Sequence, residues 1–503
     1  MASTRRERER RRWARATRLI SGVALLALGF GLLSVPEVHP LAGRAAAFSE
    51  FRWGKAELWA DLEEQFDAAR GRGCDATTAQ IDEHLTGLDA LLLQLERNAQ
   101  LPSAPVFDRL EQELFATAAL FGACPTRIEE LATRVVRLRS TVKEQSRSWP
   151  LDERVARDRL YRLLYGSRAA LEEIWLQAPA ESVSAVLHGV DEPSATPSLT
   201  LQGVKLHSGD LLLSRGGAPT SALIARGNDY PGNFSHVALL HIDEKGRASV
   251  IESHIESGVG ISSVDRYLGD TKLRIVVLRL RADHPALVPR PRLPHDAATR
   301  SLLAAKIAHI PYDFAMDSKD PQRQFCSEVP LAAYREEGVA LWKARSRMSR
   351  PGLVRWLSSL GVRHFETEAP SDLEYDPQLR VVAEWRDPRT LFADHRDNAI
   401  LDAMLESADQ GTDLEVSTLA LPAARLLKAA SVGFELLGEV GPIPEGMSPA
   451  AALRVRTLRA RHAKIAERLE RRIATHRKRL GRLPPYWTLV EEARQAMREG
   501  PLE

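Results

Sequence analysis

Three side chains in this 503-residue chain have the types that thiol catalysis uses. Cys326 precedes an apolar run with helical spacing, so we expect its sulfur at the positive N-terminal end of a helix, which stabilises a thiolate. His236 stands at the start of a strand rich in Val and Leu and is the candidate general base. Glu252 falls on the next strand, where a carboxylate would hold the tautomer and the charged form of the imidazole.

The pairing of these two strands decides whether Glu252 can reach His236. If Ile242 pairs with Ala248 across the short turn between the strands, then Ala238 faces Glu252. Glu252 is then a diagonal neighbour of His236 on the same face of the sheet. A shift of register by one residue would remove this contact.

Each catalytic candidate also has an ordinary structural interpretation. A single cysteine at a helix start is more often structural, and a single histidine on a strand is usually a hydrogen-bonded polar residue. A single glutamate is most often a surface charge. The catalytic interpretation therefore depends on Cys326, His236 and Glu252 occurring together.

Further polar residues flank these candidates. We expect Ser235, Tyr312 and Asp313 to shape a substrate pocket, although Tyr312 and Asp313 fit a simple turn before the cysteine equally well. The other histidines lack the compact spacing of zinc ligands, so we expect neither a metal nor a cofactor.

Short strands and helices surround the candidate site. Runs rich in Val, Ile and Leu predict strands at 209–214, 235–242, 248–253, 258–263, 274–280 and 381–383. Helices are expected over 296–309 and from about 325. This mixture predicts an α+β domain at about 205–390, preceded by a linker at 181–204 that is rich in Ser, Pro and Thr.

The region 48–180 has the apolar periodicity of packed antiparallel helices. Its predicted breaks place Cys74 just before one helix and Cys124 just after the next, at the same end of a helical hairpin. We therefore predict a Cys74–Cys124 disulfide, which leaves Cys326 as the odd cysteine. Two buried free thiols are the alternative.

The C-terminal region 391–503 is also predicted to be helical. Apolar residues recur from Leu453 to Ile473 among many Arg and Lys. Such a helix could lie on an anionic membrane surface, but a helical hairpin with one solvated face is the favoured interpretation.

The N-terminus has the features of an anchoring or targeting segment. Residues 5–18 hold eight Arg against two Glu, and an apolar run at 19–35 follows. The positive-inside rule keeps such an Arg cluster cytoplasmic. A transmembrane segment within 1–40 would then anchor the chain in a bacterial inner membrane, with the catalytic domain facing the periplasm or exterior. A cleaved signal peptide and a buried core helix are the alternatives.

Composition and charge exclude several other classes of protein. The chain is 44% apolar and 27% charged, as globular proteins are. Its 69 basic and 67 acidic residues nearly cancel, so we expect no nucleic-acid partner. A chain of 503 residues predicts two or three domains.

The order of the short motifs resembles that of the permuted papain-like amidases of the NlpC/P60 superfamily, in particular the YiiX-like branch. The matching segments are 209–212, 235–238, 251–253, 312–314, 325–328 and 375–385. Ordinary papain-like enzymes have the cysteine before the histidine, whereas His236 precedes Cys326 here. The resemblance covers about 205–390 and implies a circularly permuted papain-like fold.

The resemblance also implies a chemistry. Carried onto this chain, it makes Cys326 the nucleophile, His236 the general base and Glu252 the third catalytic residue, acting by acyl transfer through a thioester. The expected substrate is an amide in a peptidoglycan peptide or a related acylated molecule at the cell envelope. A lipid acyl hydrolase or acyltransferase and a non-catalytic envelope scaffold, with protein partners bound by the helical flanks, are the alternatives.

Overall fold

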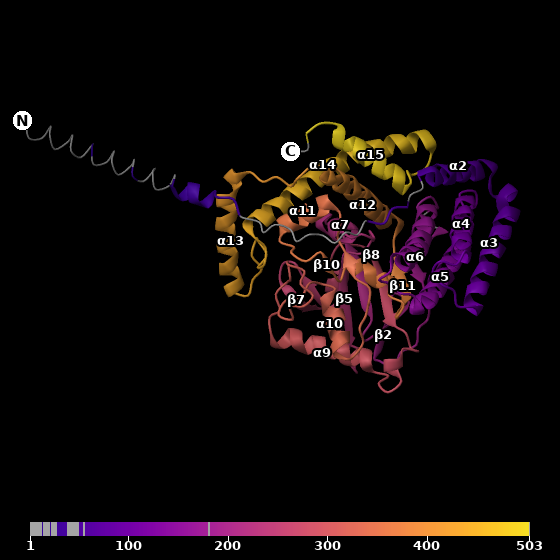
Figure 1. Cartoon of the computed structure of the whole chain (residues 1–503), viewed down its shortest axis with the longest axis horizontal. Helices are drawn as coiled ribbons and strands as arrows, with labels where there is room; N and C mark the ends of the chain where they lie inside the picture. The colour runs from indigo at the N-terminus through magenta and orange to yellow at the C-terminus, as the bar shows by residue number, and fades with distance from the viewer. Residues whose placement is uncertain are drawn as a thin grey trace, which may run out of the picture.

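The structure is a computed structural model that describes residues 13, 21, 28–37, 50–53, 56–179 and 182–501. Its first helices are α2 (Ala56–Arg72), α3 (Cys74–Arg97), α4 (Val106–Leu120), α5 (Ile128–Gln145) and α6 (Arg154–Trp175). They pack together at one end of the molecule (Figure 1). Their apolar positions are buried at spacings of three and four residues, as the sequence periodicity predicts.

The predicted disulfide is present. Cys74 opens α3 and Cys124 follows α4, and their sulfur atoms are 2.03 Å apart. Cys326 is the free cysteine and is buried.

A seven-stranded antiparallel sheet forms the centre of the chain, in the order β1-β11-β8-β4-β5-β6-β7. Its strands are β1 (Val186–His188), β4 (Leu211–Gly216), β5 (His236–Ile242), β6 (Ala248–His254), β7 (Gly258–Ser262), β8 (Lys272–Leu280) and β11 (Leu379–Trp385). All six strands predicted from the sequence are found within this sheet.

The segment 181–204, interpreted from its composition as a linker, contains strands, and that interpretation is wrong. β1 closes one edge of the main sheet by pairing with β11. β2 (Ser198–Leu201) pairs with β3 (Val204–His207) in a hairpin. Strands of three and four residues carry too little apolar periodicity to be distinguished from a polar linker.

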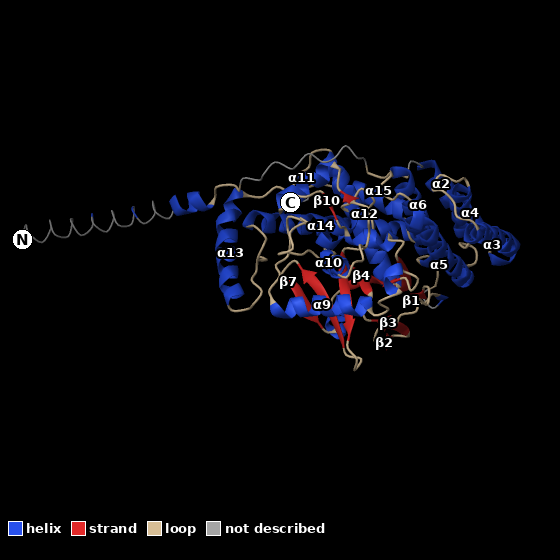
Figure 2. Cartoon of the chain, turned by 60° about the horizontal axis from the view of Figure 1, so that its bottom comes forward, coloured by secondary structure: helices blue, strands red, loops and turns tan. Residues whose placement is uncertain are grey.

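Helices cover one face of the sheet. Val237 and Leu239 of β5 pack in the same core as Leu293 of α9 (Leu293–Ile307) and Val329 of α10 (Glu328–Glu336). Figure 2 shows α9 lying across the strands. The opposite face carries Ala238 with residues of β3 and α8 (Val264–Gly269).

Other helices form a second core. They are α7 (Pro219–Arg226), α11 (Pro351–Leu360), α12 (Pro388–Asp409), α14 (Pro449–Leu480) and α15 (Tyr486–Arg498). Helix α13 (Leu421–Leu436) packs against α14 outside this core. Leu458, Ile465, Leu469 and Ile473 of α14 are buried in this core. The apolar side of α14 therefore packs within a helical hairpin and its neighbours, which agrees with the favoured interpretation.

Buried ion pairs join the N-terminal helices to the sheet domain. Arg168 on α6 binds Glu374 at 2.9 Å, and Arg139 on α5 binds Glu384 of β11 at 2.6 Å. All four side chains are at most 5% exposed. Charges this deeply buried are tolerated only when they are paired, so separating the helical region from the sheet would leave unpaired buried charges on both sides.

The N-terminal anchor prediction falls mostly on residues outside the described ones. Residues 28–33 are helical, whereas most of the rest of the run at 19–35 is not described. Among the described residues, no helix combines the length and the apolar character needed to cross a bilayer.

Candidate active site

The strand register predicted from the sequence is confirmed. Ile242 pairs with Ala248, and Ala238 pairs with Glu252. His236 occupies the first position of β5, one pleat repeat before Ala238, so its side chain emerges on the same face as Glu252. Nε2 of His236 lies 2.7 Å from Oε2 of Glu252, and the two side chains are 17% and 2% exposed.

Glu252 lies between two imidazoles. Its Oε1 is 3.2 Å from Nε2 of His254 and accepts a hydrogen bond from the Ser262 hydroxyl at 3.0 Å. The two histidine rings stack with their centroids 5.6 Å apart. Glu252 therefore has three polar partners, although its side chain is almost completely buried.

The electrostatics of this cluster follow from burial and from the carboxylate. Although burial alone would raise it, the pKa of Glu252 is held well below its usual range by the hydrogen bonds from His236 and His254. Burial lowers the pKa of His236, and the Glu252 carboxylate offsets part of this effect. The more exposed His254 has a raised pKa, because its hydrogen bond to Glu252 outweighs its desolvation.

Cys326 lies beside the main chain at the start of β5. Its Sγ is 3.9 Å from the carbonyl oxygen of Ser235. Burial raises the pKa of the thiol to about 11, against smaller opposing effects of the backbone N–H groups of Val237, Ser327 and Cys326 itself. Those N–H groups nevertheless supply hydrogen-bond donors around the sulfur.

The prediction that Cys326 stands at the start of a helix is wrong by two residues. α10 begins at Glu328, with Ser327 as its N-cap, so the sulfur does not lie inside the first turn. The expected thiolate stabilisation is absent in this resting geometry, because desolvation of the buried sulfur outweighs the backbone donors.

Cys326 lies near the main chain of His236 but does not contact its imidazole ring. Cys326 contacts the residues on either side of His236, yet no hydrogen bond links Sγ to the His236 ring among the described residues. The pleat directs His236 to the face of Ala238, whereas α10 packs on the face of Val237.

The predicted pocket residues lie close to Cys326. Burial raises the pKa of Tyr312, and the proximity of Cys326 adds to this effect. The Asp313 carboxylate accepts hydrogen bonds from the N–H groups of Ala315 and Asp317, which makes it a turn-forming residue. The Ser235 hydroxyl accepts a hydrogen bond from Gly216 N–H, so the side that faces Cys326 is its carbonyl.

Sequence reasoning assigned no role in the site to two further residues, His254 and Glu328. His254 follows Glu252 at a spacing of two on the same strand, and this alternation was the available signal. Glu328 accepts a hydrogen bond from Phe325 N–H at 2.9 Å, and burial raises its pKa to about 9. A protonated carboxyl therefore lies two residues after Cys326. The described residues contain no cluster of three His, Cys, Asp or Glu side chains arranged to hold a metal ion.

Known proteins identify the central domain. A family model described as "Permuted papain-like amidase enzyme, YaeF/YiiX, C92 family" matches residues 205–383. This region is therefore similar to the permuted papain-like amidases. The match agrees with the resemblance inferred from the motifs, and its limits are close to the predicted domain limits of about 205–390. It extends to neither helical flank.

One solved structure is also similar to part of this chain. The crystal structure of metalloprotein yiiX from Escherichia coli O157:H7 matches with 19% sequence identity, covering 35% of this chain and 95% of that one, with a TM-score of 0.29. No curated protein matches the chain.

Proposed function

We propose that the permuted papain-like domain is a thiol hydrolase that cleaves an amide, with Cys326 as nucleophile, His236 as general base and Glu252 as the residue that orients His236. The 2.7 Å contact between His236 and Glu252 carries this proposal. It supplies the base and orienting group of a catalytic triad, and the buried Cys326 contacts the main chain on either side of that base.

The contact with Glu252 assigns a role to each imidazole nitrogen. A carboxylate only accepts hydrogen bonds, so the proton lies on Nε2, and Nδ1 remains to exchange a proton with the cysteine. Cys326 loses its proton to Nδ1, and its sulfur forms a bond to the substrate carbonyl carbon. The imidazolium then gives that proton to the leaving nitrogen as the C–N bond breaks, which leaves a thioester. Water, deprotonated by Nδ1, cleaves the thioester to a carboxylic acid and restores the thiol.

This sequence of steps requires the catalytic pair to come together. In the resting geometry, both the raised pKa of Cys326 and the lowered pKa of His236 favour neutral groups. Substrate binding therefore has to bring the His236 ring and Sγ into contact, which would form the thiolate–imidazolium pair. Catalytic contacts often tighten only when substrate is bound.

The test is hydrolysis of amide substrates by the full chain and by matched variants. Muropeptides and N-acyl amino acids are incubated with wild type, Cys326→Ser, His236→Ala and Glu252→Gln, and the released amines are measured by mass spectrometry. We expect a loss of roughly 10³-fold or more for Cys326→Ser and His236→Ala. His241→Ala, which changes a histidine outside this cluster, should retain full activity. Equal activity of wild type and Cys326→Ser would reject the thiol mechanism.

We further propose that the enzyme acts at a membrane surface of the cell envelope, on a peptidoglycan peptide or a related acylated substrate. The exposed face of α13 supports this proposal. Leu426, Leu436 and Leu437 are 64%, 83% and 79% exposed. Arg425 on α13 donates hydrogen bonds to the carbonyl oxygens of Leu33 and Val35, so the end of the apolar N-terminal run is tied to this face (Figure 1).

An apolar face beside an apolar terminal segment is suited to a bilayer interface. It also favours the second candidate function, a lipid acyl hydrolase or acyltransferase, since a lipid substrate would already lie at this surface.

Flotation of the full chain with anionic vesicles tests the location. Leu436→Ser combined with Leu437→Ser should reduce vesicle binding several-fold, because two exposed apolar side chains are lost. The matched control is Val288→Ser combined with Ile307→Ser, which changes two side chains of similar exposure away from α13. Equal binding by the α13 variant and this control would reject α13 as a membrane contact. Lipid thioester or ester hydrolysis by wild type, in the absence of amide cleavage, would favour the second function.

A further inference from the structure

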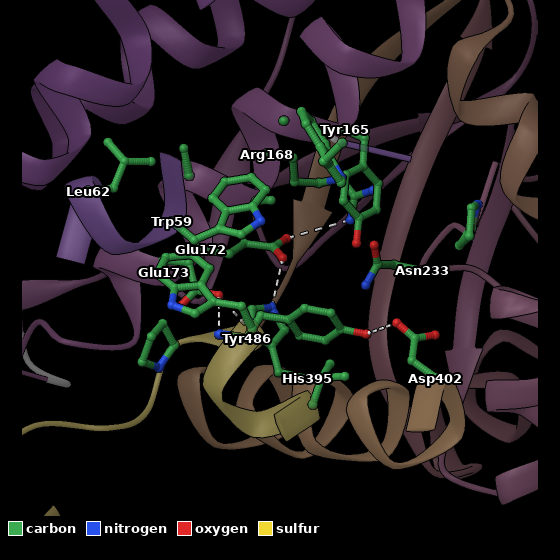
Figure 3. A pocket seen from close by; sticks show the side chains of 18 of the residues that line it. Trp59, Leu62, Tyr165, Arg168, Glu172, Glu173, Asn233, His395, Asp402 and Tyr486 are labelled. Carbon is green, nitrogen blue, oxygen red and sulfur yellow. Dashed lines mark hydrogen bonds and ion pairs between the residues drawn. The ribbon is translucent and has the colours of Figure 1, made fainter. Parts of the chain in front are cut away.

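A large cavity lies between the N-terminal helices and the C-terminal helices, apart from Cys326 and His236. Its volume is about 1070 Å³, and α6, α12 and α15 contribute to its wall (Figure 3). A volume of this size holds a small organic molecule. None of the predicted catalytic residues lines it, so the proposed hydrolase does not account for it.

One carboxylate in the wall has no strong cationic partner. Asp402 and Glu406, which also line the cavity, are each paired with an arginine, Arg226 and Arg494. No lysine or arginine forms an ion pair with Glu173 among the residues that the structure describes. Its nearest polar partners are the Tyr486 N–H at 3.0 Å and Nδ1 of His395 at 3.7 Å. Burial correspondingly raises the pKa of Glu173.

His395 presents a second unused acceptor at the same place. Its Nε2 is 3.1 Å from the Glu172 carboxylate, which assigns the ring proton to Nε2 in the neutral imidazole. Nδ1 is then an acceptor, and it has no hydrogen-bond partner although the side chain is only 6% exposed. Two acceptors that face the same space, at a separation too long for a direct hydrogen bond, can both be satisfied by one group that carries several donors.

Aromatic rings adjoin these acceptors. Glu173 binds the main chain of Tyr486, and the next residue, Trp487, stacks on Trp59 with ring centroids 5.2 Å apart. Trp53 meets Trp59 edge to face at 5.6 Å. Such rings bind apolar groups and, through their faces, organic cations.

We propose that this cavity binds an organic amine, with its ammonium group between Glu173 and His395 and its apolar body against Trp59 and Trp487. An ammonium group supplies the several N–H donors and the positive charge that the two acceptors lack. A carboxylate ligand would meet Glu173 with like charge, and an alcohol would supply only one donor.

The proposal is tested by titration calorimetry and tryptophan fluorescence on the full chain with three matched probes. These are 4-phenylbutylamine, 4-phenylbutanol and 4-phenylbutyrate, which share a body and differ in the head group. We expect the amine to bind about tenfold or more tightly than the alcohol, because a buried ion pair and its hydrogen bonds distinguish them. Binding should quench tryptophan fluorescence.

Two variants, each with a matched control, assign the site. Glu173→Gln keeps an acceptor for Tyr486 N–H, and it should remove the preference for the amine while leaving alcohol binding unchanged. Glu406→Gln, which removes a cavity carboxylate that is already paired, should leave the preference intact. Ala169→Trp fills the cavity and should abolish binding of all three probes, whereas Val155→Trp on the exposed side of α6 should not.

The outcomes separate the alternatives. Equal affinity for amine and alcohol, or strongest binding of the carboxylate, would overturn the assignment of Glu173 and His395. If Glu173→Gln and Glu406→Gln reduce the preference for the amine equally, the preference comes from the overall negative charge of the cavity wall. That result would also overturn the assignment of Glu173 and His395. Binding that survives Ala169→Trp would place the probe elsewhere and reject the cavity.

Discussion

Glu252 holds His236 in one tautomer through a 2.7 Å contact between Oε2 and Nε2. The same carboxylate reaches His254 through its other oxygen at 3.2 Å. The buried base of the proposed triad is thus oriented by a carboxylate that is itself fixed by a second imidazole and by the Ser262 hydroxyl. Because these contacts exist without substrate, His236 is preorganised in its tautomer even though it does not yet contact Cys326.

The Glu252 pairing predicts a pH-dependent contribution to stability. The pKa of Glu252 is lowered, so its contribution is complete above the ordinary value of 4.5 and is lost as the pH falls. The pKa of His254 is raised, so its contribution is complete below the ordinary value of 6.5 and is lost as the pH rises through the raised value. Glu252→Gln should therefore lower the free energy of unfolding most between pH 4.5 and pH 6.5, by about 1.5–3 kcal/mol.

Thermal unfolding from pH 3 to pH 9 measures this dependence. The difference between wild type and Glu252→Gln should narrow toward both ends of the range. Glu83→Gln, at an exposed position on α3, is the control and should be within about 0.5 kcal/mol of wild type throughout. A constant difference across the range would show that the loss is steric rather than electrostatic.

The buried Cys326 thiol should be unreactive in the resting protein. With a pKa raised to about 11, its thiolate fraction at pH 7 is roughly one in 10⁴. Alkylation by iodoacetamide, followed by intact mass, should therefore be slow at neutral pH and should rise toward pH 11. His236→Ala should change this little, because the ring does not contact the sulfur.

A substrate-like amide that brings the pair together should lower the midpoint for alkylation in wild type but not in His236→Ala. A midpoint already below about 8.5 without ligand, lost in His236→Ala, would contradict the resting geometry and show a preformed ion pair.

Local patterns in the sequence were sufficient to predict the strands and the strand register. Val- and Ile-rich runs located β5 and β6, and the short turn between them set the pairing that joins His236 to Glu252. Antiparallel helix spacing likewise predicted the partner of Cys74.

Properties that arise from tertiary packing were not predictable in the same way. A helix expected from about residue 325 suggested a stabilised thiolate at Cys326, but α10 begins only at Glu328, and burial reverses the direction of the pKa shift of the thiol. The cavity at Glu173 lies between α6 and α12, which are more than 200 residues apart in the sequence, so no local sequence pattern predicts it. The strand β1 was missed because its stability comes from pairing with β11, at the far end of the domain.

The disulfide should contribute strongly to the stability of the N-terminal helices. Cys74 and Cys124 are 50 residues apart, and the loop-entropy relation gives about 4 kcal/mol for such a closure. Cys74→Ser combined with Cys124→Ser should lower the free energy of unfolding by that order, measured by urea denaturation. Cys326→Ser is the control and should leave reductant sensitivity unchanged. An identical urea midpoint with and without reductant would contradict a stabilising bridge.

The Arg168–Glu374 ion pair predicts that the helical region and the papain-like domain unfold together. Both side chains are 1% exposed, and Nε and Nη2 of Arg168 each donate a 2.9 Å hydrogen bond to a different Glu374 oxygen. In Arg168→Met, the buried Glu374 carboxylate keeps only its hydrogen bond from Arg139 as compensation for its charge. This change should lower the free energy of unfolding by about 3–5 kcal/mol.

Arg137→Met is the matched control, because its ion pair with Glu96 is about one-third exposed and stays within the helical region. Arg137→Met should lower the free energy of unfolding by at most about 1 kcal/mol. Hydrogen exchange measured on both parts distinguishes the possibilities. If Arg168→Met loosens only α6 and leaves protection in β8 and β11 unchanged, the two parts are independent. Loss of protection in both, at the same denaturant concentration, is the expected result, because a carboxylate stranded at their interface destabilises the packing that each provides to the other.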